Sequence, residues 1–185
     1  MDKYILDTNI FINAHRQFFP IDFCLAFWSF LERLNQNGEV YSIENVWLEI
    51  VRGNEQDLLK EWAKEHKSMF LNIDAKTAIS VGQIIGDLQK SSYVFRDSAI
   101  AEFAEAADSF VVAFAKENEF TVVSHEVSSK ASISKKHIKI PDICSLYKVP
   151  YISIYQLFVK KKDVYMATTS CEDYHKRLFR EYKDK

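Results

Sequence analysis

Short apolar runs alternate with longer amphipathic stretches along most of this 185-residue chain. The runs of strand length lie at 3–6, 40–43, 69–73, 120–123 and 151–153. Strands that alternate with helices form parallel or mostly parallel sheets, because each crossover helix packs back onto a face of the sheet. The sequence therefore predicts an α/β fold with a central, mostly parallel sheet.

The stretches between these runs carry apolar residues at three- and four-residue steps, which is the spacing of one helix face. In the stretch 22–37 the apolar face comprises Phe23, Phe27, Phe30, Leu31 and Leu34. Helices are predicted at 22–37, 44–52, 55–66, 74–90 and 97–118, with short helices starting at Pro141 and covering 154–159. The helix predicted at 55–66 carries Leu58, Leu59 and Trp62.

The composition fits one well-buried domain, because 48% of the residues are hydrophobic and only four Gly and three Pro are present. We expect one folded domain over 1–160 and a charged C-terminal helix or tail over 161–185. Three cysteines, Cys24, Cys144 and Cys171, are too far apart for a C-x-x-C metal site and odd in number. This use of cysteine is typical of a reducing compartment. The sequence also has no leader pattern and no apolar run of membrane-spanning length, so it predicts a cytoplasmic protein without a membrane partner.

The net charge of −2 excludes an overall positive charge of the kind that is typical of nucleic-acid-binding proteins. Local basic clusters remain, and each is either a solvated face or a phosphate contact. The candidates for substrate binding are Lys130, Lys135, Lys136 and Lys139, with a second cluster at 160–162.

Several carboxylates lie inside apolar segments rather than on charged faces. Asp7 follows the first strand, and Glu126 comes shortly after the strand 120–123. Glu49 and Asp108 lie in apolar parts of helices, although Glu49 is equally able to pair with Arg52 on a helix surface. Because the carboxyl ends of parallel strands share one edge, these side chains are expected to converge there.

Four converging carboxylates repel one another unless cations neutralise them. Oxygen ligands without Cys or His select hard ions, so the sequence predicts Mg²⁺ or Mn²⁺ as the cofactor. Mg²⁺ held by carboxylates points to phosphate chemistry. Two such ions, about 3.5–4 Å apart, clamp an in-line attack of water on a phosphodiester.

The order of these groups resembles the PIN domain. The matching elements are Asp7-Thr8-Asn9 after the first strand, Glu49 in a later helix, Asp108 leading an Ala- and Val-rich helix, and Ser124-His125-Glu126 after the next strand. The resemblance covers about residues 3–158. More narrowly, segments 122–126 and 139–144 resemble the DUF4411 branch of PIN-like proteins.

The resemblance implies a three-layer α/β/α sandwich and a metal-dependent endoribonuclease that leaves a 5′-phosphate and a 3′-hydroxyl. It places the catalytic and metal-binding carboxylates at Asp7, Glu49, Asp108 and Glu126. The usual fourth residue of the family is Asp, so Glu126 departs from the pattern and Asp142 competes for that position. Thr8, Asn9 and Ser124 are expected to orient these ligands. His125 is expected to be a loop residue rather than a ligand.

Some PIN domains are VapC toxins, so the resemblance also implies RNA as the substrate and a cognate antitoxin protein as a partner. Phe18, Phe19 and Trp28 are candidates for that interface or for a homodimer, although such residues also form cores. The alternative function is a weak or inactive PIN-fold binding protein. A phosphatase with an aspartyl nucleophile is disfavoured, because the general acid it needs two residues later is Asn9.

Overall fold

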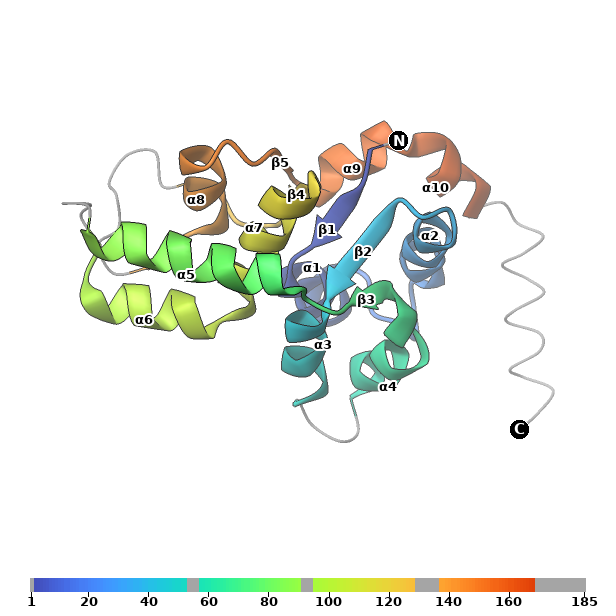
Figure 1. Cartoon of the computed structure of the whole chain (residues 1–185). Helices are drawn as coiled ribbons and strands as arrows, with labels where there is room; N and C mark the ends of the chain where they lie inside the picture. The colour runs from blue at the N-terminus through green and yellow to red at the C-terminus, as the bar shows by residue number, and fades with distance from the viewer. Residues whose placement is uncertain (1, 53–56, 91–94, 129–136, 169–185) are drawn as a thin grey trace.

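The computed structural model describes residues 2–52, 57–90, 95–128 and 137–168. Within these residues, five strands form a sheet in the order β3-β2-β1-β4-β5, and all neighbouring strands are parallel (Figure 1). The strands are β1 (Tyr4–Leu6), β2 (Val40–Ile43), β3 (Phe70–Leu71), β4 (Thr121–Val123) and β5 (Tyr151–Ile152). Each lies within a run predicted from the sequence, so the α/β prediction is confirmed.

The helices alternate with these strands along the chain. They are α1 (Thr8–Asn13), the π-helix η1 (Ala14–Phe18), α2 (Leu25–Gln36), α3 (Glu44–Val51), α4 (Leu58–Glu65), the 3-10 helix η2 (Lys67–Met69), α5 (Ala75–Lys90), α6 (Asp97–Glu105), α7 (Ala107–Asn118), α8 (Ile140–Leu146), α9 (Ile154–Lys160) and α10 (Lys162–Thr168).

Helices cover both faces of the sheet. Helix α7 contacts β1, β2 and β4 and is backed by α5 and α6, whereas α2 contacts β2 and packs against α10. In Figure 1, α5, α6, α7 and α8 lie on one side of the sheet and α2, α9 and α10 on the other. The molecule is therefore the expected three-layer α/β/α sandwich.

The strand order reverses beside β1, since the chain adds β2 and β3 on one side of it and β4 and β5 on the other. The crevice at such a switch point, outside the carboxyl ends of the strands, is where open α/β sheets bind ligands. Asp7 and Ser124 directly follow the two strands that meet there, β1 and β4.

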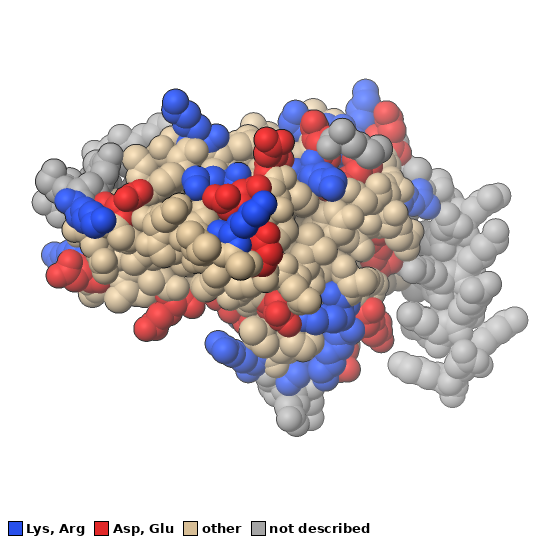
Figure 2. All heavy atoms as spheres, viewed as in Figure 1, with Lys and Arg blue, Asp and Glu red and all other residues tan. Residues whose placement is uncertain are grey.

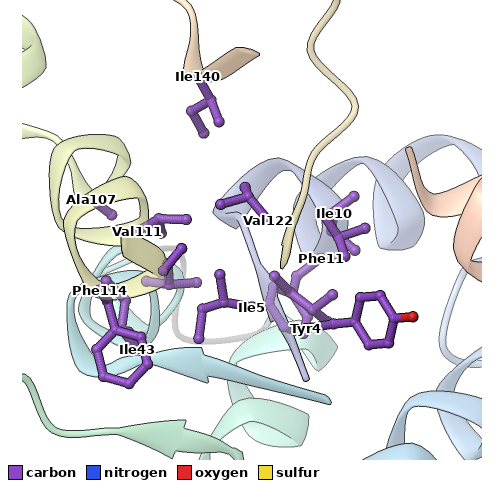
Figure 3. Close-up of a cluster of buried hydrophobic side chains, with 14 of the residues drawn as sticks. Tyr4, Ile5, Ile10, Phe11, Ile43, Ala107, Val111, Phe114, Val122 and Ile140 are labelled. Atoms are coloured by element: carbon purple, nitrogen blue, oxygen red, sulfur yellow. The ribbon is translucent and has the colours of Figure 1, made fainter. Parts of the chain in front are cut away.

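The core is built around β1, whose three residues are all buried. Figure 3 shows the side chain of Ile5 toward Val111 of α7 and Ile43 of β2, while the ring of Tyr4 points away from them. Successive residues of a strand face opposite sides of a sheet, so β1 contributes to the core on both faces. This packing fixes the position of the chain immediately before Asp7.

The helix predicted over 97–118 is wrong in one respect, because it is two helices. Ala106 has extended backbone angles (φ −75°, ψ 156°), and α7 begins afresh at Ala107. The alanines around this point favour helix on both sides, so the sequence pattern does not reveal the break. The break places a helix N-terminus inside the molecule, and the groups that satisfy it belong to the site described below.

Two aromatic predictions are also corrected. Phe23 was expected on the buried face of a helix, but it precedes α2 and is 81% exposed. Trp28 was a candidate for an interface, but it is only 2% exposed and its indole N–H donates to the carbonyl of Phe19 (2.8 Å). The start of α2 at residue 25 leaves Phe23 outside the helix, whereas Trp28 lies on the buried face of α2 with Phe27 and Leu31.

The segment after α9 packs against the domain. Helix α10 contacts α2, and the ring of Tyr165 lies 5.4 Å from Phe30 and 5.1 Å from Phe158 between centroids. The rest of the predicted C-terminal segment, 169–185, lies outside the described residues. Among the described residues, none of the helices is both long and apolar enough to cross a membrane.

Candidate acidic site at the carboxyl edge of the sheet

Asp7 is the most buried member of the predicted site, with a relative exposure of 0%. Its backbone N–H donates to the carbonyl of Val123 (3.1 Å), so the pairing of β1 with β4 extends to this residue. The hydroxyl of Ser124 donates to Asp7 Oδ2 (2.9 Å). Among the described residues, Asp7 Oδ1 is the one buried side-chain oxygen or nitrogen without a hydrogen-bond partner.

This environment raises the pKa of Asp7 to about 6. Burial is the largest cause, and the negative charge of Glu126 adds to it. The Ser124 hydroxyl and the backbone N–H groups of Thr8 and Asn9 act in the opposite direction. A buried carboxylate with an unsatisfied oxygen is costly unless a cation or a proton occupies that position.

Asp108 lies in the first turn of α7 and faces the same group of charges. Its pKa is raised to about 8, chiefly by burial and in addition by the negative charges of Asp7, Glu126 and Glu49, against a smaller opposite effect of Lys139. These couplings show that the fold brings the four predicted carboxylates together. The N-terminus of a helix favours the charged form of a carboxylate and so lowers its pKa. At Asp108, burial and the neighbouring negative charges have the larger effect.

Glu49 joins three elements at the site. Its Oε2 atom accepts a hydrogen bond from the Thr8 hydroxyl (2.5 Å), and its Oε1 atom accepts one from the backbone N–H of Ala107 (2.9 Å). Glu49 on α3 therefore caps α7 at the break beside Ala106 and is tied to α1. These contacts favour the site over the alternative in which Glu49 pairs with Arg52 on the helix surface.

Glu126 has a similar role at the next helix. Its Oε2 atom accepts a hydrogen bond from the backbone N–H of Ile140, the first residue of α8 (2.8 Å). Its Oε1 atom is 2.5 Å from Lys139 Nζ, and this bond is the main reason that the pKa of Lys139 is raised. The backbone N–H of Glu126 donates to Ser124 Oγ, which connects it to Asp7.

Asp142, the other candidate for the fourth acidic position, accepts a hydrogen bond from the Ser128 hydroxyl (2.6 Å). It is not among the main charges that raise the pKa of Asp108, which are those of Asp7, Glu126 and Glu49. Lys139, predicted to bind substrate, is engaged by Glu126 within the acidic group. The other predicted phosphate contacts, Lys130, Lys135 and Lys136, lie outside the described residues.

A cavity of about 200 Å³ opens beside this group. Its charged lining comprises Glu102, Asp108, Glu126 and Lys139, and Phe103 of α6 is among its apolar lining. On the face that Figure 2 shows, Lys and Arg side chains are interspersed with Asp and Glu, so no single sign of charge dominates there.

The donor set fits a hard divalent cation. Mg²⁺ commonly binds proteins through one or two carboxylates and keeps several waters. Asp7 Oδ1 lacks a partner and the negative charge of Asp7 raises the pKa of Asp108, whereas Glu49 and Glu126 already bind protein groups. Accordingly, in the part of the chain that the structure describes, no three His, Cys, Asp or Glu side chains are already grouped to hold a metal.

A comparison with protein families identifies the chain. The model of a domain of unknown function, DUF4411, matches residues 4–165. The chain belongs to the DUF4411 family. This match spans every strand of the sheet and all of the carboxylates described above, so the predicted membership is confirmed for the domain as a whole.

Comparisons with individual proteins add less about this DUF4411 chain. Two solved structures resemble it: DNA-bound VapBC from Salmonella typhimurium, and VapBC2 from Rickettsia felis bound to a DNA fragment from their promoter. The first has 21% identity and a TM-score of 0.45, covering 75% of this chain and 98% of that chain. The second has 15% identity and a TM-score of 0.45, covering 74% and 96%. A search of curated proteins found no match.

Two groups at the DUF4411 site were not predicted from the sequence. They are the backbone N–H groups of Ala107 and Ile140, which hold Glu49 and Glu126. Every residue except proline carries such a donor, so residue type gives no signal for them. A signal exists only for Ile140, because Pro141 marks the start of a helix.

Proposed function

We propose that this DUF4411 protein is a metal-dependent endoribonuclease that hydrolyses RNA phosphodiester bonds at the acidic site. The observation that carries the proposal is the buried, unpartnered Oδ1 atom of Asp7 beside Asp108, whose pKa is raised to about 8. A cation between Asp7 and Asp108 would compensate the cost of burying two negative charges close together. Mg²⁺ or Mn²⁺ at this position would polarise the phosphate and activate water.

The residues of the chain have distinct roles in this proposal. Asp7 and Asp108 would hold the metal, and Ser124 holds the Asp7 carboxylate by its second oxygen. Glu49 and Glu126, fixed at the starts of α7 and α8, would complete the acidic surroundings of the metal and its water. The charge couplings at Asp108 favour Glu126 over Asp142 as the fourth acidic residue.

The test is RNA cleavage by purified protein with Mg²⁺ or Mn²⁺, on a panel of labelled structured RNAs resolved on denaturing gels. Asp7→Asn and Asp108→Asn each remove a charge without changing size, so cleavage should fall by about 100-fold or more. Asp142→Asn is the matched control, since it changes a nearby acidic residue outside the proposed group. Full activity of Asp7→Asn, or loss of activity only in Asp142→Asn, would contradict the assignment.

A second candidate function is a PIN-fold binding protein with little or no nuclease activity. The observation that favours it is the engagement of Glu49 and Glu126 by protein donors, which leaves only two carboxylates for a metal. Thermal unfolding with added Mn²⁺ separates the two. The nuclease proposal predicts that Mn²⁺ raises the Tm of the wild type and that Asp108→Asn abolishes the effect. No effect of Mn²⁺ on the wild type would favour the binding protein.

We propose further that the biological role is that of a toxin with a cognate antitoxin. The support for this part is the resemblance of the sequence to PIN domains of the VapC type. The relevant test is co-expression with the protein encoded by the neighbouring open reading frame. Co-purification and inhibition of RNA cleavage are expected, and the absence of any inhibitory neighbour would remove this part while leaving the nuclease proposal intact.

A further inference from the structure

Five aromatic rings form a closed group beside the end of β4. The ring of Phe18 lies 6.5 Å from Phe19 and 5.8 Å from His125 between centroids. The ring of Tyr155 lies 6.2 Å from His125 and 6.4 Å from Phe158. Phe158 and Phe19 complete the group at 6.2 Å. The rings come from η1, the residue after it, the segment after β4, and α9.

The members of this group differ in exposure. Phe19 and Phe158 are partly buried and pack on Phe27, which belongs to the core. Phe18 is 48% exposed and Tyr155 is 56% exposed. We call Phe18, His125 and Tyr155 the aromatic surface. Because the inner rings support them, the outer rings present a large apolar area in a fixed arrangement, which is typical of a binding site.

The aromatic surface adjoins the acidic site through the segment 124–126. Ser124 bonds to Asp7, and Glu126 bonds to the start of α8. His125, between them, contacts η1 and α9 instead. One short segment therefore faces the carboxylates with two residues and the aromatic surface with the third.

We propose that the aromatic surface binds unpaired bases of single-stranded RNA next to the phosphate held at the acidic site. This inference rests on the proposed nuclease function and specifies the form of its substrate. Exposed rings stack on the faces of bases, and those faces are accessible only where the RNA is unpaired. The His125 ring is inclined by 39° to Phe18 and by 70° to Tyr155, so neither pair is a parallel stack in which two ring faces cover each other.

The helix that carries Phe18 supports this proposal. It is a π-helix, closed by the N–H of Phe19 donating to the carbonyl of Ala14 (2.6 Å), and such helices are frequent at functional sites. Arg16 lies on the same helix with a side chain that is 61% exposed and a guanidinium 4.0 Å from the carboxylate of Asp57. The exposed part of this guanidinium is available to a phosphate of the same RNA strand.

The test measures RNA binding without cleavage, by fluorescence anisotropy of a labelled single-stranded oligonucleotide with the full-length protein in EDTA. Tyr155→Ala and Phe18→Ala should each weaken binding by about fivefold or more, because each removes one stacking ring. Tyr155→Phe keeps the ring and should bind like the wild type. Phe23→Ala is the matched control, since Phe23 is 81% exposed but is not part of the aromatic group.

Two oligonucleotide controls complete the design. A strand of the same length with abasic sites should bind equally weakly to the wild type and to Tyr155→Ala, and a duplex should be insensitive to the substitution. Thermal unfolding of each variant should match the wild type, because the substituted side chains are exposed.

The outcomes distinguish this proposal from the proposed function. If Tyr155→Ala loses affinity but the wild type cleaves no RNA, the aromatic surface is supported and the nuclease is not. If the wild type cleaves RNA but Tyr155→Ala and Phe18→Ala bind single strands normally, the aromatic surface proposal is overturned. It is also overturned if the variants change only the mass measured by light scattering, because the surface would then join two copies of the chain.

Discussion

The candidate site contains two kinds of carboxylate with the same charge and different surroundings. Glu49 and Glu126, the glutamate pair, each accept a backbone N–H at the first residue of a helix and a second donor from a side chain. Asp7 and Asp108, the aspartate pair, have pKa values raised to about 6 and about 8. The comparison shows that the glutamate pair is bound to protein donors, whereas Asp7 keeps an unpartnered oxygen, which the proposed function assigns to a cation.

The largest expected effect concerns the aspartate pair and pH. A carboxyl group whose pKa is higher in the folded than in the unfolded chain stabilises the fold while protonated and loses that contribution as the pH rises. For Asp108 the interval runs from 3.8 to about 8. The free energy of unfolding in EDTA should therefore fall by about 3 kcal/mol between about pH 5 and pH 8.

Urea unfolding at several pH values measures this fall. Asp108→Asn should flatten the pH dependence and make the metal-free protein more stable than the wild type at pH 8. A wild-type stability that is constant or rises over this interval would contradict the difference between the two pairs.

The next effect concerns the glutamate pair. Glu49→Ala leaves the N–H of Ala107 and the hydroxyl of Thr8 without an acceptor, and it should destabilise the protein by about 1–3 kcal/mol. Glu49→Gln keeps an acceptor and should lose less. The urea midpoint at pH 7 in EDTA provides the measurement. If Glu49→Ala is as stable as the wild type, Glu49 does not maintain the break between α6 and α7.

A smaller effect is expected at Thr8, whose hydroxyl donates to Glu49 Oε2. Thr8→Val keeps the shape and removes the donor, at an expected cost of about 1 kcal/mol. Thr8→Ser restores the hydroxyl and is the control. The two variants should differ in Tm, and identical Tm values would show that this hydrogen bond adds nothing to the glutamate pair.

The smallest effect is expected at Lys139, because its side chain is 41% exposed and solvent screens its attraction to Glu126. Lys139→Gln should destabilise the metal-free protein by about 0.5 kcal/mol at low salt. The difference from the wild type should shrink as salt is added. A salt-independent loss would instead indicate that Lys139 acts through packing.

The sequence predicted the sheet more completely than the site. Five short apolar runs are enough to give the strands, since buried parallel strands read as continuous apolar segments. The positions of Asp7 and Glu126 after two of those runs brought them to one edge. The partners of Glu49 were not predictable, because they depend on a helix break at Ala106 that alanine-rich sequence conceals. Phe23 shows the same limit, since a helix boundary three residues later reversed its environment.

The central position of β1 determines when the site can form during synthesis. Asp7 and Ser124, which share a hydrogen bond, are separated by 117 residues. The ribosome therefore has to release most of the domain before β4 can cover the open edge of β1. Until then Asp7 lacks its hydrogen-bond partner Ser124. The four carboxylates can assemble only after Glu126 has been translated, so a nascent chain that ends before Glu126 carries no finished site.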